Sequence, residues 1–106
     1  MTFQVDLAEE KYLTKIATQC RGDHLQCVTS YYVKVKITPE NSFTTVCGTT
    51  SCPQLFTGND PGLDSDTVIT NEFDWTIAAR FVRLNPNTWE RHIALRWEIY
   101  GCDQLN

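Results

Sequence analysis

The residues with the clearest chemistry are eight in a row, Cys20 to Cys27, which read CRGDHLQC. A disulfide between the two cysteines would close a small ring that presents Arg21, Gly22 and Asp23. The guanidinium can pair with receptor carboxylates, and the Asp23 carboxylate can complete the coordination of a divalent cation held by a receptor. Because the ring restricts the loop in advance, little entropy is left to lose on binding. We therefore expect receptor binding through residues 21–25, which include His24 and Leu25, with no cofactor beyond a cation supplied by the receptor.

The cysteines also have a purely structural interpretation. Closing an eight-residue ring contributes about 2.5 kcal/mol in the chain-entropy model, with no receptor involved. A second close pair, Cys47 and Cys52, suggests another disulfide and a secreted protein. Four cysteines allow three connectivities, and a zinc site is the competing interpretation, although these spacings are loose for one. Cys102 is left over from the two pairs, so we expect it outside any disulfide or in one with another chain.

Nothing in the sequence is typical of an enzyme. There is no nucleophile elbow, no HExxH and no glycine-rich phosphate loop. His92 precedes a predicted strand with no acid or nucleophile positioned nearby, so we interpret it as a loop or packing residue. Oxygen-bearing side chains could bind calcium at Asn59, Asp60, Asp64 and Asp66. These lack the spacing of an EF-hand loop, so we interpret them as a solvated turn and predict no catalytic residue and no metal site.

Composition sets outer limits on the function. The 106 residues suffice for one domain, residues 1–106, with a net charge of −4. Nine basic residues are spread along the sequence, which disfavours nucleic acid and long-range attraction to anionic lipid. No segment is apolar for long enough to span a membrane, and the N-terminus does not resemble a signal peptide. For a chain with disulfides, we expect that a leader was removed or that the sequence is part of a longer protein.

The elements that must position these residues are predicted to be strands. Apolar and polar residues alternate with period two in several runs, at 3–7, 31–38, 67–73, 79–84 and 93–100. In the second run Val33, Val35 and Ile37 share one face. Turn residues separate the runs at 39–41, 58–62 and 85–87, and we interpret a short helical pattern at 6–11 as a turn. Short strands so spaced predict an all-β sandwich or barrel.

The strands also carry a family resemblance. The segments FQVDL, IATQ, VTSYYVKV and FTGN are followed by VITNEFDWTIAARFVRLNPNTWERHIALRWEIYGC. From Phe3 to Cys102 the chain resembles a discoidin domain, also called the coagulation factor V/VIII type C domain. The ending, from Ala79 through Trp89 to Gly101-Cys102, is specific to that family.

The resemblance implies a distorted jelly-roll β-barrel whose loops project as spikes from one end. It also implies a non-catalytic extracellular module that binds phosphatidylserine membranes, glycans, collagen or peptide ligands. The family's first cysteine usually bonds its last, which Cys102 matches. Because the likeness starts at FQVDL, we expect the family's N-terminal strands, first cysteine and first two spikes to be missing.

The resemblance gives the ring a location. The loop from Gln19 to Tyr31 corresponds to the family's third spike, which supplies part of a ligand pocket in some members. Cys20 stands where the family commonly has glycine and Cys27 where it has tryptophan, while the pair Cys47 and Cys52 is not a hallmark. The family's hydrophobic membrane-inserting spikes are mostly absent.

Three functions follow from these observations. The first is cell adhesion, in which the ring engages an integrin-type receptor. The second is a cell-surface glycan- or phospholipid-binding module in which the tripeptide is incidental, with contacts from Arg21, His24, Leu25 and the turn from Asn85 to Trp89. The third is a homodimer formed through Cys102 or through an exposed sheet edge.

Overall fold

The computed structural model describes residues 2–21, 26–60, 66–91 and 93–103. Within these ranges the chain forms a single antiparallel sheet and no helix, which confirms the all-β prediction. There is accordingly no helix among them that could cross a membrane. The strands are β1 (Phe3–Gln19), β2 (Cys27–Lys36), β3 (Thr44–Thr45), β4 (Phe56–Thr57), β5 (Ile69–Glu90) and β6 (Arg96–Cys102).

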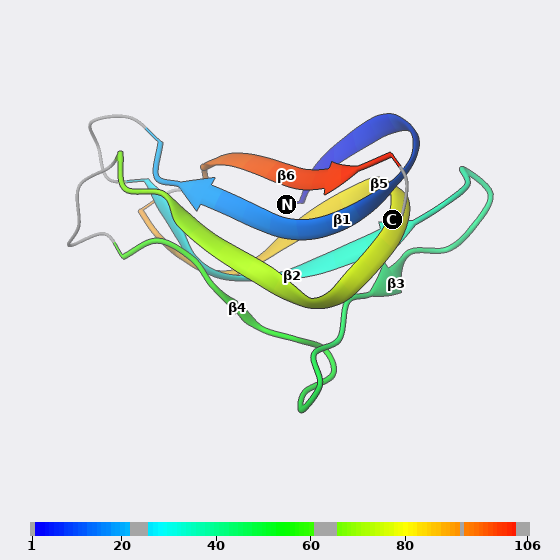
Figure 1. The fold of residues 1–106 in the computed structure, drawn as a ribbon. Coiled ribbons are helices and arrows are strands. Elements are labelled where there is room, and N and C mark those ends of the chain that lie inside the picture. The colour runs from blue at the N-terminus through cyan, green and yellow to red at the C-terminus, as the bar shows by residue number, and fades with distance from the viewer. Residues whose placement is uncertain (1, 22–25, 61–65, 92, 104–106) are drawn as a thin grey trace.

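The sheet runs β3-β2-β5-β1-β6, with β4 also paired to β2. The long strands β1 and β5 pair along most of their length, and both bend, so the sheet curves around a central core (Figure 1). The second half of β5 pairs with β2 on one side and with the start of β1 on the other, whereas the second half of β1 lies between the first half of β5 and β6. The strands β1 and β5 therefore extend from the β2 side of the sheet to the β6 side, and their continuity fixes these two sides relative to each other.

Residues 6–11 were predicted to form a turn, but they lie within β1, which has an irregular, bulged pairing here. Residues 7–10 lie between the partner pairs Asp6–Phe81 and Lys11–Ala79, where β5 supplies only Arg80. A carboxylate oxygen of Asp6 accepts a hydrogen bond from the Ala8 amide at 2.8 Å. Ala8 has a φ of 73°, the left-handed conformation that a side-chain cap of this kind helps to hold. The extra residues bend the strand, as β-bulges do.

The predicted turn at residues 85–87 is wrong. These residues belong to β5, which continues to Glu90 beside β2. The same strand also takes in most of the run predicted at 67–73 and all of the run predicted at 79–84. Proline is tolerated because the pairing slips here: Ser30 faces Thr88 and Tyr31 faces Pro86, with Asn87 as an extra residue. A proline cannot donate to the sheet, and a bulge is a position where it need not do so.

The core lies on the concave side of the sheet. Alternate residues of β2 and β5 point into it, including Val33, Val82 and Leu84. Tyr31 stacks on Phe56 with ring centroids 5.5 Å apart, and Phe73 meets Phe56 edge-on at 5.7 Å. Ile37 was predicted to share the buried face, but it follows the end of β2 and is 43% exposed.

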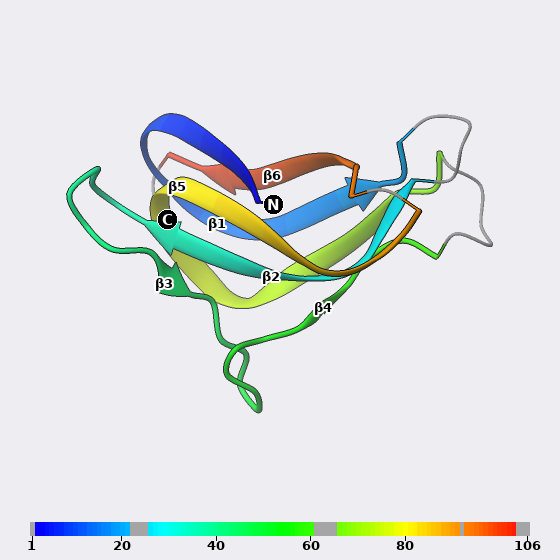
Figure 2. The ribbon, with the colours of Figure 1, turned by 180° about the vertical axis from the view of Figure 1, so that it is seen from behind.

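Chain segments that are distant in sequence meet at one end of the barrel. β1 ends there, β2 begins there, β5 both begins and ends there, and β6 starts there (Figures 1 and 2). The antiparallel pairing produces this convergence because neighbouring strands run in opposite directions. The ring between Cys20 and Cys27 lies at this end, which we call the loop end.

Candidate functional site

The base of the ring is buried. Cys20 and Cys27 form a disulfide with an S–S distance of 1.99 Å and a Cα–Cα distance of 4.4 Å. Their side chains are 1% and 0% exposed, so the bond is part of the packed end of the barrel. Cys20 directly follows β1 and Cys27 opens β2, and both ends of the ring are therefore held by long paired strands.

Above the disulfide, the two chain ends next to the cysteines stay paired. Arg21 pairs with Gln26, and the Arg21 amide donates to the Gln26 carbonyl at 2.8 Å. Arg21 is exposed, as a receptor contact must be. The other predicted binding residues, Gly22, Asp23, His24 and Leu25, lie outside the described residues.

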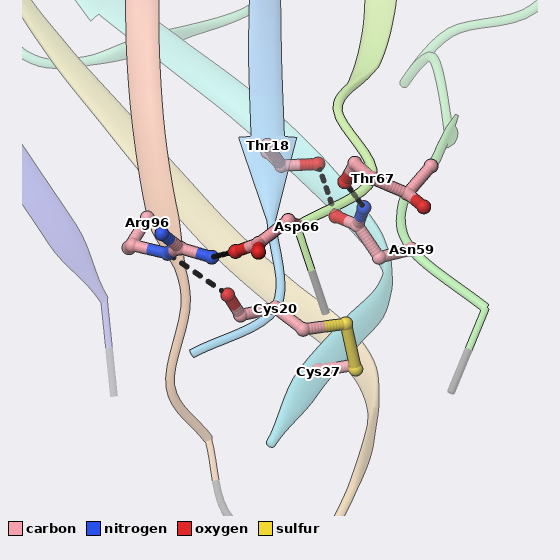
Figure 3. The surroundings of a disulfide bond; sticks show 7 residues. All are labelled: Thr18, Cys20, Cys27, Asn59, Asp66, Thr67 and Arg96. Atoms are coloured by element: carbon pink, nitrogen blue, oxygen red, sulfur yellow. Dashed lines mark hydrogen bonds and ion pairs between the residues drawn. A yellow bond between two sulfur atoms is a disulfide. The ribbon is translucent and has the colours of Figure 1, made fainter. Parts of the chain in front are cut away.

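Arg96 connects the base of the ring to the segment before β5. Its Nε donates to the Cys20 carbonyl at 3.0 Å, and its Nη2 lies 3.2 Å from an Asp66 carboxylate oxygen (Figure 3). Gln19 adds a second connection, since its amide nitrogen donates to the Asp66 carbonyl at 2.8 Å. The ion pair with Asp66 is largely exposed and so contributes little stability itself. Its role is geometric, because it joins the ends of β1 and β6 to a third segment.

A second set of contacts, centred on Asn59, lies beneath the ring. Asn59 is 3% exposed; its side-chain oxygen accepts from the Thr18 hydroxyl at 2.8 Å, and its side-chain nitrogen donates to the Thr67 carbonyl at 3.0 Å (Figure 3). The neighbouring Gly58 lies so close to β2 that a Cβ there would sit 2.2 Å from the Val28 carbonyl oxygen. The interpretation of Asn59 as part of a solvated turn is therefore wrong: its amide group is a buried structural connector.

The residues from Asn85 to Trp89 form part of β5 and not a turn, and only their Trp89 end lies beside the ring. Glu90 pairs with Cys27 and Trp89 pairs with Val28. The Trp89 side chain is 45% exposed, which leaves an aromatic surface next to the base of the ring. Farther from the ring, the Thr88 hydroxyl lies 2.6 Å from that of Thr29 and 2.5 Å from that of Ser30.

A second disulfide ring lies away from the loop end. Cys47 and Cys52 are bonded, with a Cα–Cα distance of 4.5 Å, as the spacing predicted. Inside this ring the Gly48 amide donates to the Ser51 carbonyl at 2.8 Å. Asp74 of β5 holds the ring from outside by accepting from the Thr49 amide at 2.7 Å.

Cys102 takes part in neither disulfide. It lies exposed at the end of β6, with its Sγ 4.0 Å from the Tyr12 carbonyl oxygen. In the part of the chain that the structure describes, β6 pairs only with β1 and forms one edge of the sheet. The homodimer through Cys102 or this edge stays a prediction.

Among the described residues near the ring, one titratable group has a large pKa change. The large pKa change in this region belongs to Tyr31, whose pKa burial raises to about 12. Tyr31 accepts a hydrogen bond from the Asn71 side chain at 3.1 Å and serves the core. Over the described ranges, no three His, Cys, Asp or Glu side chains gather closely enough to hold a metal ion.

Sequence reasoning found the ring but missed the residues that support it. Arg96 and Asn59 are separated from Cys20 by long stretches of sequence, and only the antiparallel pairing brings them to one place. The nearest sequence signals were the strand pattern around Arg96 and the segment FTGN around Asn59. Neither pattern states what those side chains contact.

Comparisons with known proteins agree with this architecture. The family model for the F5/8 type C domain matches residues 1–99. Neurexin-4 of Drosophila melanogaster is 35% identical over 102 residues, which cover 96% of this chain and 8% of that protein. Lactadherin of Rattus norvegicus is 38% identical over 101 residues, covering 93% of this chain and 22% of that protein. The chain thus spans a small part of these relatives.

The fold has a solved counterpart. Recombinant discoidin II of Dictyostelium discoideum superposes with a TM-score of 0.79 at 28% identity, covering 98% of this chain and 38% of that one. A Clostridium perfringens structure, CpGH89CBM32-6, is 17% identical with a TM-score of 0.57 and shares the fold alone. The jelly-roll architecture implied by the resemblance is confirmed by these neighbours. With its family model, its relatives and its fold in agreement, this chain belongs to the F5/8 type C, or discoidin, domain family of non-catalytic binding modules.

Proposed function

We propose that this chain is an extracellular adhesion module that presents its disulfide ring to an integrin-type receptor. The observation that carries the proposal is the construction of the ring: a buried disulfide at its base and an Arg21–Gln26 pair above it. Residues 22–25 thus connect two ends that are already fixed in position. A ligand fixed in this way loses less entropy on binding than an open loop.

The chemistry of the ring suits such a receptor. The exposed Arg21 guanidinium can form a bidentate pair with a receptor carboxylate. The carboxylate of Asp23 is a hard oxygen ligand, the type that completes the coordination of Mg²⁺ or Ca²⁺. The cation would be supplied by the receptor, so binding should depend on divalent cations.

Two further observations support the proposal, one on the compartment and one on the position of the ring. Disulfides persist in oxidising compartments, and two of them close loops of this domain. The support from Arg96 and Asn59 places the ring on a rigid base at the loop end. Binding loops carried on a rigid scaffold are common among recognition domains.

The test is binding of purified integrins to the immobilised domain in Mn²⁺ and in EDTA. We expect saturable binding that EDTA abolishes. Asp23→Glu should reduce binding by about tenfold or more, because one added methylene displaces the coordinating carboxylate. Arg21→Gln should also weaken binding, since the guanidinium pair is lost.

Glu40→Asp is the matched control. It changes a carboxylate side chain by one methylene in an exposed turn far from the ring, so integrin binding should stay unchanged. Binding that persists in Asp23→Glu with wild-type affinity contradicts the proposal.

A second candidate, glycan or phospholipid binding, is favoured by one observation. Trp89 presents an exposed aromatic ring next to the base of the disulfide ring. Aromatic side chains of this kind stack on sugars and sit well at a membrane interface. Binding to a glycan array or to phosphatidylserine liposomes that is lost in Trp89→Ala but retained in Asp23→Glu would assign the loop end to this function instead.

A further inference from the structure

The structure gathers basic residues that the sequence scatters. Of nine lysine and arginine residues in the chain, four lie together on strands β2 and β5: Lys34, Lys36, Arg80 and Arg83. Lys34, Lys36 and Arg83 alternate with the core residues Val33, Val35, Val82 and Leu84, so they point to the opposite, outer face of the sheet. We call these three residues and Phe43 the basic face.

The register shows how closely the cations lie. Lys34 is the direct partner of Arg83, and side chains so placed are about 5 Å apart at Cβ. Arg83 is also the partner of Gln4 on β1, and Lys34 is also the partner of Thr45 on β3, so the four residues form one row across the sheet. The row therefore crosses four strands and contains two cations and no acid. A like-charged cross-strand pair is unfavourable for the sheet itself.

The neighbouring acidic group is already occupied. Asp6 forms a two-pronged ion pair with Arg80, with N–O distances of 2.9 and 3.0 Å, and Arg80 holds the pKa of Asp6 below its usual value. In the described parts of the chain, Lys34, Lys36 and Arg83 have no carboxylate within ion-pair distance. Arg83 instead donates to the neutral Gln4 side chain at 2.9 Å. Three uncompensated positive charges thus remain on one face of a chain whose net charge is −4.

Aromatic rings account for two of these cations but not for the third. The Arg83 guanidinium lies 3.9 Å from the Phe43 ring centroid, and the Lys36 ammonium lies 4.8 Å from the same centroid. These cation–π contacts hold both groups against the sheet. Lys34 has no such contact within the described ranges, although it stands opposite Arg83. A packing role for the face therefore leaves Lys34 unexplained.

We propose that the basic face binds a linear sulfated polysaccharide. Three cations gathered on one face match a chain that carries successive sulfate groups, and guanidinium pairs well with such oxyanions. The compartment decides among polyanions, because disulfides indicate the cell exterior, where nucleic acid is not the prevailing partner. A lipid surface is less well matched, since Phe43 is half-buried and its ring is in contact with two of the cations. This site is separate from the ring and does not depend on the adhesion proposal.

The experiment uses heparin as the probe. Titration of the folded domain with heparin at several NaCl concentrations should give a Kd that rises steeply with salt. Lys34→Gln should weaken binding by about tenfold at low salt and reduce the slope of log Kd against log salt by about one unit. Arg83→Gln should act similarly. Thermal unfolding of each variant shows whether the fold is kept.

Lys15→Gln is the matched control. Lys15 also lies over an aromatic ring, with its ammonium 5.2 Å from the Tyr100 centroid, but it belongs to the part of β1 that pairs with β6. The substitution Lys15→Gln removes the same charge as Lys34→Gln, so an effect of net charge alone would be equal for the two variants. Equal losses, no heparin binding by the wild-type domain, or binding to phosphatidylserine vesicles or DNA with none to heparin would each overturn the proposal.

Discussion

The two disulfide rings of this domain are alike in covalent design and different in setting. Among the described residues, each has a backbone hydrogen bond next to its disulfide, from Arg21 to Gln26 in the first and from Gly48 to Ser51 in the second, both 2.8 Å long. The first joins the long strands β1 and β2 through two buried cysteines. The second lies between the two-residue strands β3 and β4, and its Cys52 is exposed.

The comparison separates two contributions of a disulfide. Chain-entropy arguments give nearly equal stabilisation, about 2.5 kcal/mol for the first ring and about 2.2 kcal/mol for the second. What differs is the packing around the sulfur atoms. Only the first ring also has Arg96 and Asn59 beneath it. The location of a disulfide thus determines whether it supports the fold as well as its own loop.

Removing the two disulfides should give the largest difference. We expect Cys20→Ala/Cys27→Ala to lower the free energy of unfolding by about 4 kcal/mol, the ring-closure contribution plus lost buried packing. Cys47→Ala/Cys52→Ala should lower it by about 2 kcal/mol, because little packing is lost. Urea denaturation of both double variants measures the difference. Equal losses would show that burial of the first disulfide adds nothing.

The connector beneath the first ring should have the next largest effect. Asn59→Ala leaves the buried Thr18 hydroxyl and the Thr67 carbonyl without their partner, so we expect a loss of about 2–3 kcal/mol. Asn41→Ala is the control, since Asn41 makes its hydrogen bond with Thr38 in an exposed turn and should cost about 0.5 kcal/mol. Similar unfolding curves for the two variants would remove Asn59 from the support of the ring.

The smallest effect should come from Arg96→Gln. Loss of the hydrogen bond to the Cys20 carbonyl should raise the exchange rate of the Arg21 amide hydrogen about fivefold, while the Gly48 amide of the second ring stays unchanged. Amide exchange followed by NMR gives both rates in one experiment. The control is Arg91→Gln, which removes an exposed charge just after the end of β5 and should leave both rates unchanged. Equal acceleration of both amides would mean that Arg96 acts on the whole fold.

Several features could be predicted from local sequence. The period-two runs located the strands, and the close cysteine pairs located both rings. The turn expected at 6–11 was wrong, because these residues stay in β1 as a bulged part of the strand. The turn expected at 85–87 was wrong because proline and asparagine favour turns locally, whereas here pairing with β2 and a bulge hold them in a strand.

Local sequence thus decided where the chain extends, where cysteines close a loop and which tripeptide the first loop carries, since backbone preference and ring size act over a few residues. Pairing between distant strands decided the rest. It brought Arg96 and Asn59 under the ring, placed Trp89 beside it, and set Lys34 opposite Arg83 on the outer face. Those contacts depend on register, and a register is fixed only when both faces of the sheet and the shared core are in place.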